Sequence, residues 1–254
     1  MKKIAYIVAF TAAVSLLTMC KEPDELLFAG GIEDIYFRLP EPEDDEDLIL
    51  RKNTIDTIAY TFAYDPELTE REVRVPVEIT GLPHNTDRTY HIEITTATGT
   101  VSGVDFKPIS TTQTVRSGLS KDYISVVFLR NASMEEEVKS IKFRVLDGGD
   151  FKEGLVESLE IVVQASDILE RPGWWPYWEA NAFGPWHPKK LREWIKIWGG
   201  KGELPAASGH GWLSYPNEYM AILKLRAVFE QAAKDGDESF LGYDGKYLTI
   251  PANF

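Results

Sequence analysis

Short segments in which apolar and polar residues alternate follow one another through the first two thirds of the chain. Alternate side chains of a strand share a face, so this period of two predicts β-strands, and turn signals such as "RSGLS" and "LDGGD" separate them. The pattern predicts a β-sandwich domain at residues 32–166, antiparallel and of about seven strands. Its apolar faces are Ile58 to Tyr64, Val73 to Ile79, Tyr90 to Ile94, Ile124 to Phe128, Ile141 to Val145 and Leu159 to Val163.

One of these segments, "VRVPVEI", carries a proline on its polar face. Proline has no N–H to give to a strand ladder, so it is confined to edges and bulges. Pro76 therefore predicts that its strand lies at the edge of a sheet or contains a bulge.

The period changes to 3.6 in the last third of the chain, which predicts a mostly helical, Trp-rich module at residues 167–254. In "HPKKLREWIKIWGG" a helix is expected from Pro188 to the glycines, with one apolar stripe. "YPNEYMAILKLRAVFEQAAKDG" predicts a second helix that Gly236 ends, and "GKYLTIPANF" predicts a terminal strand near Tyr247. The expected buried positions are Leu191, Trp194, Ile195 and Trp198 in the first helix, and Ile222, Leu225, Phe229 and Ala232 in the second.

The N-terminus has the features of a signal peptide, residues 1–19. Lys2 and Lys3 precede an apolar run from Ile4 to Leu17, which is too short to span a bilayer. The run ends in "LLTMC", which resembles the bacterial lipobox, although Met19 replaces the usual small residue. This resemblance implies cleavage before Cys20 and its acylation; the alternative is a plain secretory signal with an incidental free cysteine. With only one cysteine, no internal disulfide can form.

The residues after Cys20, "CKEPDE", resemble the export signal of Bacteroidetes surface lipoproteins. That resemblance implies an anchor on the outer face of the outer membrane. Residues 20–31 are expected to be a lipidated tether, and a charged, solvated linker explains the same composition.

The acidic run "EPEDDED" at residues 41–47 predicts a solvated loop. Carboxylates suit calcium, but their spacing here matches no calcium loop, so we expect no metal or cofactor. A net charge of −13 disfavours nucleic acid as a partner.

Two stretches, "TGTVSGVDFKPIS" and "TVRSGLSKDYISVVFL", resemble the Calx-β-like pattern of immunoglobulin-like sandwiches. An Asp-aromatic-x-Pro bend leads into one strand, and a glycine turn leads into the next. The resemblance supports the fold class, mainly β with a C-terminal α module, and implies nothing about a ligand.

The whole layout resembles a family of Bacteroidetes lipoproteins labelled only as a domain of unknown function. The most specific pieces are the junction "LERPGWWPYW" and the helix "HPKKLREWIKIWGG". The resemblance implies an accessory subunit beside SusC/SusD-type nutrient importers. It supplies no catalytic or ligand-binding residues.

Motifs that would carry catalysis do not occur in the sequence. None of the histidines (His84, His91, His187 and His210) has a zinc-binding spacing, and there is no G-x-S-x-G nucleophile elbow. We therefore expect no enzyme, with a carboxylate-based surface hydrolase as the alternative.

All seven tryptophans fall between Trp174 and Trp212. Trp194 and Trp198 lie on a helix stripe and are expected in the core. The others are candidate contacts to a glycan, a peptide or the transporter, since large aromatics dominate such contacts; packing between domains is the alternative. These candidates are Trp174, Trp175, Trp178, Trp186 and Trp212. We interpret the chain as a non-catalytic accessory or ligand-capturing subunit, or else as a scaffolding lipoprotein that contacts the transporter.

Overall fold

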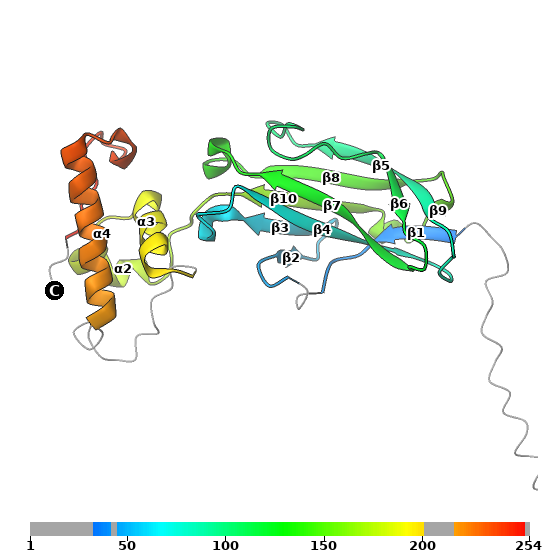
Figure 1. The fold of residues 1–254 in the computed structure, drawn as a ribbon, viewed down its shortest axis with the longest axis horizontal. Coiled ribbons are helices and arrows are strands. Elements are labelled where there is room, and N and C mark those ends of the chain that lie inside the picture. The colour runs from blue at the N-terminus through cyan, green and yellow to red at the C-terminus, as the bar shows by residue number, and fades with distance from the viewer. Residues whose placement is uncertain (1–32, 42–44, 201–215, 252–254) are drawn as a thin grey trace, which may run out of the picture.

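A computed structural model describes residues 33–41, 45–200 and 216–251, and they form two sheets followed by a helical module (Figure 1). The four-stranded sheet has the order β7-β4-β1-β9, and the six-stranded sheet has the order β2-β3-β10-β8-β5-β6. The strands are β1 Glu33–Phe37, β2 Ile49–Arg51, β3 Asp56–Thr61, β4 Glu70–Ile79, β5 Arg88–Thr96, β6 Thr112–Val115, β7 Lys121–Leu129, β8 Lys139–Leu146, β9 Phe151–Glu153 and β10 Glu160–Ser166.

The predicted sandwich is confirmed, but it is mixed rather than purely antiparallel. β1 pairs with β9 in parallel, and β3 pairs with β10 in parallel. A parallel pair needs a long crossover, which the intervening strands supply in both cases. Sequence periodicity reports which side chains share a face and does not report strand direction, so it could not reveal this feature.

The alternating apolar positions form the core between the sheets, as predicted. In β4 the side chains of Val73, Val75, Val77 and Ile79 are at most 5% exposed, and polar residues take the other face. Strand β3 is shorter than expected, because the chain turns into a 3-10 helix at Phe62–Tyr64. The Thr61 hydroxyl accepts a hydrogen bond from the Ala63 N–H and caps that turn.

The prediction that Pro76 marks an edge or a bulge is wrong for the strand as a whole, which has neighbours on both sides, but an edge is present locally, because β1 ends at Phe37 and the side of β4 from Pro76 to Glu70 has no neighbouring strand. Strand β4 lies between β7 and β1, and Pro76 pairs regularly with Tyr123 of β7. The Pro76 carbonyl accepts from the Arg38 N–H at 3.0 Å, on the side of β1. The nitrogen of Pro76 points to the β1 side, at a position beyond the end of β1 at Phe37. The missing N–H of proline therefore removes no hydrogen bond between β4 and β1 or between β4 and β7.

The helical module contains α2 Trp175–Trp178, a π-helical turn Glu179–Phe183, α3 Pro188–Trp198, α4 Pro216–Asp235 and a 3-10 helix Glu238–Phe240. Helix α3 agrees with its prediction: the His187 Nδ1 atom caps its start by accepting from the Lys189 N–H, and Gly199 at φ 86° ends it. In α4, Ile222, Leu225, Phe229 and Ala232 are buried as expected, and Gly236 follows at φ 73°. The predicted terminal strand is reduced to one bridge between Leu241 and Tyr247.

A buried ion-pair network joins the module to the sandwich. Asp167 directly follows β10 and is 2% exposed. Its carboxylate accepts from the Arg130 guanidinium at 2.8 Å and from Arg192 Nη1 of α3 at 2.7 Å. Arg130 lies after β7 and also donates to the Pro66 carbonyl at 2.8 Å. The network fixes α3 against the end of the sandwich.

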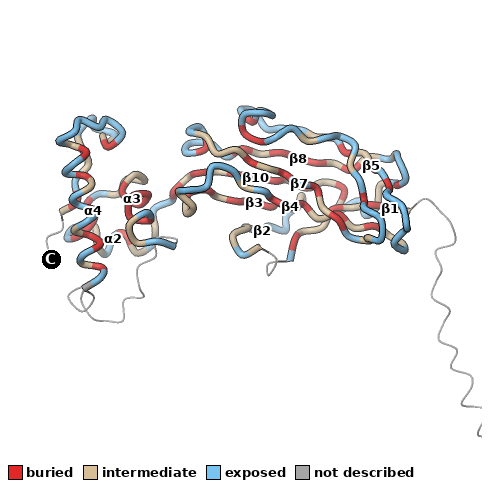
Figure 2. Tube along the Cα trace, in the orientation of Figure 1, coloured by how far each residue is buried: buried red, intermediate tan, exposed pale blue. Residues whose placement is uncertain are grey.

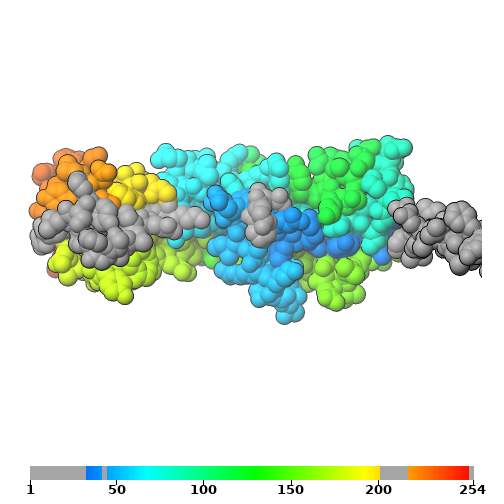
Figure 3. Space-filling model, turned by 90° about the horizontal axis from the view of Figure 1, so that it is seen from below, coloured from blue at the N-terminus to red at the C-terminus, as the bar shows by residue number. Residues whose placement is uncertain are grey.

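The two parts lie end to end, and each has its own buried centre (Figures 1, 2 and 3). Strand β1 begins at the end of the sandwich that is farthest from the helices (Figure 1). Among the residues that the structure describes, no helix has the length and apolar character needed to cross a membrane.

Candidate functional site

One of the predicted tryptophan contacts, Trp175, lies in the core of the helical module. Trp175 is 0% exposed, and its Nε1–H donates to the Gly184 carbonyl at 3.1 Å. Its ring stacks on Trp174 at 5.4 Å between centroids and meets Trp186 edge-on at 4.8 Å. A buried ring offers no face to a ligand, so the structure corrects the assignment of Trp175 as a contact residue.

The remaining tryptophan candidates are only partly accessible. Trp174, Trp178 and Trp186 are half-buried and pack against the same cluster. Trp194 is 0% exposed, as expected of a helix stripe. Trp198, which was also expected in the core, is only half-buried at the end of α3, where its ring stacks on Trp194 at 5.3 Å. Trp212 and Cys20 lie outside the described residues. The structure thus gathers Trp174, Trp178 and Trp186 at the rim of an aromatic core and forms no open tryptophan platform from them.

Among the described residues of the module, the most exposed aromatic side chains are two tyrosines that the sequence did not single out. Tyr177 of α2 is 82% exposed, and Tyr243 is 87% exposed. The Tyr243 ring lies 4.7 Å from the ring of His187. The segments around Tyr177 and Tyr243 are short and have no regular alternation of apolar and polar residues. The sequence therefore does not show which of their side chains face solvent.

A buried lysine holds the turn that encloses the tryptophans. Lys190 is 2% exposed, and its Nζ donates to the carbonyls of Phe183 and Pro185, each at 3.0 Å. Burial lowers the pKa of Lys190 to about 8, from its ordinary 10.5. This ammonium is bound by backbone carbonyls, which suits a structural cap of the turn.

The lowered pKa predicts a stability that depends on pH. The unfolded chain binds the Lys190 proton more tightly than the folded protein does, so unfolding free energy should rise from about pH 8 to about pH 10.5. Lys190→Met should remove this slope, on the order of 1–3 kcal/mol, while lowering stability near pH 7 because two carbonyls lose their donor. Urea unfolding of both proteins at pH 7.5 and pH 10 measures the difference. An equal rise of unfolding free energy with pH in both proteins would contradict the lowered pKa of Lys190.

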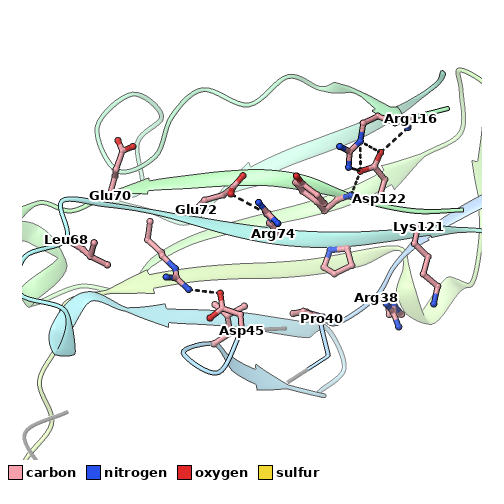
Figure 4. Close-up of a pocket in the computed structure, with 14 residues that line it drawn as sticks. Arg38, Pro40, Asp45, Leu68, Glu70, Glu72, Arg74, Arg116, Lys121 and Asp122 are labelled. Carbon is pink, nitrogen blue, oxygen red and sulfur yellow. Dashed lines mark hydrogen bonds and ion pairs between the residues drawn. The ribbon is translucent and has the colours of Figure 1, made fainter. Parts of the chain in front are cut away.

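A concavity lies on the sandwich. This groove has a volume of about 760 Å³ and lies between β4 and the segment that leads from β1 to β2 (Figure 4). Its size is in the range of ligand pockets. The lining residues are Arg38, Pro40, Asp45, Leu48, Leu68, Glu70, Arg71, Glu72, Arg74, Pro76, Arg116, Lys121, Asp122 and Tyr123.

Every charged side chain that lines the groove has a partner of opposite charge. Arg71 Nη2 lies 2.6 Å from Asp45 Oδ2, and Arg74 Nε lies 3.3 Å from Glu72 Oε2. The other pairs are Arg38 with Glu41 and Glu78, Lys107 with Glu70, Arg116 with Asp122, and Lys121 with Glu78. The groove is thus polar and locally neutral.

Two acids of the groove, Glu72 and Asp122, are held in their ionised forms. The Ser125 hydroxyl donates to Glu72 and lowers the pKa of that carboxyl, with help from Arg74. Burial raises the pKa of Asp122, but hydrogen bonds from Arg116 and from the backbone outweigh it and the pKa is lowered. These groups can accept hydrogen bonds, and they are poor proton donors near neutral pH.

The groove also contains an aromatic ring between two guanidinium groups. The guanidinium carbon of Arg74 lies 4.7 Å from the centre of the Tyr123 ring, and that of Arg116 lies 5.2 Å from it. Such cation–π contacts hold the long arginine side chains in place. They help to keep this part of the groove in one shape.

Two acids of the acidic loop contact an arginine of β4. Asp45 accepts a hydrogen bond from Arg71, and Asp47 Oδ2 lies 4.0 Å from the same guanidinium. Residues 42–44 of this loop lie outside the described part. Within the described residues, no group of three or more acidic, histidine or cysteine side chains is arranged to hold a metal ion.

Sequence comparison places most of the chain in one family. A family model described as "Domain of unknown function (DUF4843)" matches residues 31–200, from the start of the sandwich to the end of α3. No curated protein matches the sequence.

Several solved structures are similar over about half of the chain. The Calx CBD1 domain is 14% identical over 54% of this chain and 100% of its own, with a TM-score of 0.34. A two-domain protein of unknown function from Bacteroides fragilis is 10% identical over 53% of this chain and 45% of its own, with a TM-score of 0.31. A Bacteroides ovatus protein described as a "putative carbohydrate binding protein" is 13% identical over 54% of this chain and 38% of its own, with a TM-score of 0.32.

Proposed function

We propose that this chain, which belongs to the DUF4843 family, is a non-catalytic binding subunit of a nutrient-uptake system at the cell surface. The groove on the sandwich carries the proposal. It joins apolar side chains, such as Leu68 and Pro76, with hydrogen-bonding groups whose charges are already balanced. Such a surface suits capture of a neutral or mixed-charge ligand, glycan or peptide.

Two acids of the groove, Glu72 and Asp122, favour binding over hydrolysis. A glycoside hydrolase needs one carboxyl group that stays protonated near neutral pH, next to a second, ionised one. Glu72 and Asp122 both have lowered pKa values and hold an arginine. Neither is suited to give a proton to a leaving group.

We place the protein on the outer face of the outer membrane, anchored by acylated Cys20, beside a SusC/SusD-type transporter. The lipobox-like "LLTMC" and the "CKEPDE" that follows support the anchor. The described chain begins at the end of the sandwich farthest from the helices (Figure 1). An anchor upstream of Glu33 would leave the helical module pointing away from the membrane.

A scaffolding subunit is the second candidate, and the exposed tyrosines favour it. Tyr177 and Tyr243 present almost all of their side-chain surface to solvent, and tyrosine is enriched in protein interfaces. In this alternative the module binds the transporter and the groove is incidental.

Cys20→Ala should move the protein from the membrane fraction to the soluble fraction, because the proposed anchor consists of lipid chains on that thiol. Fractionation of cells that express each form measures this. Cys20→Ala recovered in membranes would contradict the anchor.

A pull-down from detergent-solubilised outer membranes tests the partner. Stoichiometric recovery of a SusC-like transporter with the wild-type chain is expected. A transporter that is retained by wild type and lost from Tyr177→Ala would favour the scaffolding alternative.

A further inference from the structure

Strand β4 is much longer than the neighbour on one of its sides. It pairs with β7 along its whole length, from Glu70 opposite Leu129 to Glu78 opposite Lys121. On the other side, β1 pairs only with Val77 to Ile79. The residues from Glu70 to Val75 therefore have a strand on one side only.

The backbone groups of alternate β4 residues point in opposite directions. The Ile79 N–H donates to Ser120 on the β7 side, whereas the Pro76 carbonyl accepts from Arg38 on the β1 side. The backbone N–H and C=O groups of odd-numbered residues thus point to β7, and those of even-numbered residues point to the side where β1 has ended. Glu70, Glu72 and Arg74 direct their N–H and C=O groups to that open side, and no described residue pairs with them through its backbone.

This open edge forms one side of the groove. From β4 it is lined by Glu70, Arg71, Glu72, Arg74 and Pro76, and from the segment after β1 by Pro40, Asp45 and Leu48 (Figure 4). Six strand residues span roughly 20 Å at about 3.3 Å each. The edge can therefore receive an extended segment of about that length.

We infer that the groove binds an extended peptide, which adds to the sheet as a strand paired with Glu70, Glu72 and Arg74. The inference rests on the proposed binding function and specifies its ligand. A row of backbone donors and acceptors at the strand repeat is matched by another peptide backbone, and this mode of recognition gives affinity through main-chain bonds.

The side chains around the edge define the peptide further. Side chains of an added strand alternate between two faces. One set would lie toward Leu48 and Leu68, of which Leu68 is 37% exposed; the other would lie beside the ion pair of Glu72 and Arg74. The ligand is thus a segment in which apolar and polar residues alternate, without a strong net charge.

A proline substitution distinguishes a ligand that pairs with the backbone of β4 from one that is recognised only by side chains of the groove. Glu72→Pro removes one N–H from the open edge and no N–H from the ladder with β7. Strand β4 already carries a proline at an equivalent, even-numbered position, Pro76, so the variant should fold. Glu72→Ala is the matched control, because it loses the same carboxylate and keeps the N–H.

The probe is a synthetic pool of ten-residue peptides in which Val, Ile, Leu or Phe alternates with Ser, Thr, Lys or Glu. It is passed over the immobilised full chain, and maltose, cellulose and xylan oligosaccharides form a second arm. We expect wild type and Glu72→Ala to retain peptides, and Glu72→Pro to retain at least tenfold less at an unchanged thermal midpoint.

Equal retention of peptides by Glu72→Pro and Glu72→Ala would overturn strand addition. Retention of oligosaccharides without peptides would also overturn it, and would leave the proposed binding function in place. If neither peptides nor oligosaccharides are retained, both strand addition and the proposed binding function are contradicted.

Discussion

Replacing Asp167 by alanine is expected to lower the free energy of unfolding by about 3–5 kcal/mol, because it leaves the buried Arg192 and the partly buried Arg130 without their counter-charge. Asp167 is 2% exposed and holds Arg130 from the sandwich and Arg192 from α3. Urea unfolding followed by far-UV circular dichroism measures the loss. Arg192 reaches only one other carboxylate, Glu135, at 3.5 Å, and that side chain is largely exposed.

Glu179→Ala serves as the matched control for Asp167→Ala. It also breaks a carboxylate–arginine pair, with Arg171 at 2.8 Å, but both side chains are more than a third exposed. Exposed pairs contribute about 0–1 kcal/mol, so this variant should unfold close to wild type. A similar loss of unfolding free energy in the two variants would show that the Asp167 network contributes no more to stability than an exposed ion pair.

Trp175→Ala is expected to cost about 3–5 kcal/mol and to leave ligand binding unchanged. The ring is fully buried, packs on Trp174, Phe183 and Trp186, and donates one hydrogen bond. Its loss leaves a cavity and an unpaired Gly184 carbonyl. Thermal unfolding and ligand retention are measured on the same preparation.

The exposed neighbour Tyr177 provides the control for Trp175. Tyr177→Ala removes an aromatic ring from the same short helix, but that side chain is 82% exposed. Its effect should stay within about 0.5 kcal/mol. A Trp175→Ala protein that is as stable as wild type but does not retain ligand would show that Trp175 takes part in ligand binding.

Much of the fold could be predicted because burial follows a period. Val73 to Ile79 alternate in sequence and in exposure, and Leu191, Trp194 and Ile195 form the buried stripe of α3. The parallel pairs β1–β9 and β3–β10 were missed, because strand direction depends on contacts between segments distant in sequence. Pro76 indicated an edge, but the sequence could not show that the edge is local, because this depends on where the neighbouring strand β1 ends.

The candidate site was less predictable than the fold. Trp174, Trp175, Trp178 and Trp186 lie in proline-punctuated chain without a period, so their exposure could not be derived; packing against one another decided it. The groove was not predicted at all. Its open edge follows from the difference in length between β4 and β1, and its ion pairs join residues as far apart as Asp45 and Arg71.

The central claim is that ligands bind to the sandwich groove and not to the aromatic module. Leu68→Trp fills the groove from its rim, and the double variant Tyr177→Ala/Tyr243→Ala strips the exposed aromatics from the module. Retention of the peptide pool and of the oligosaccharides on each immobilised, folded protein is the most direct measurement. The account predicts at least a tenfold loss for Leu68→Trp and retention near wild type for the double variant, whereas the reverse order would contradict it.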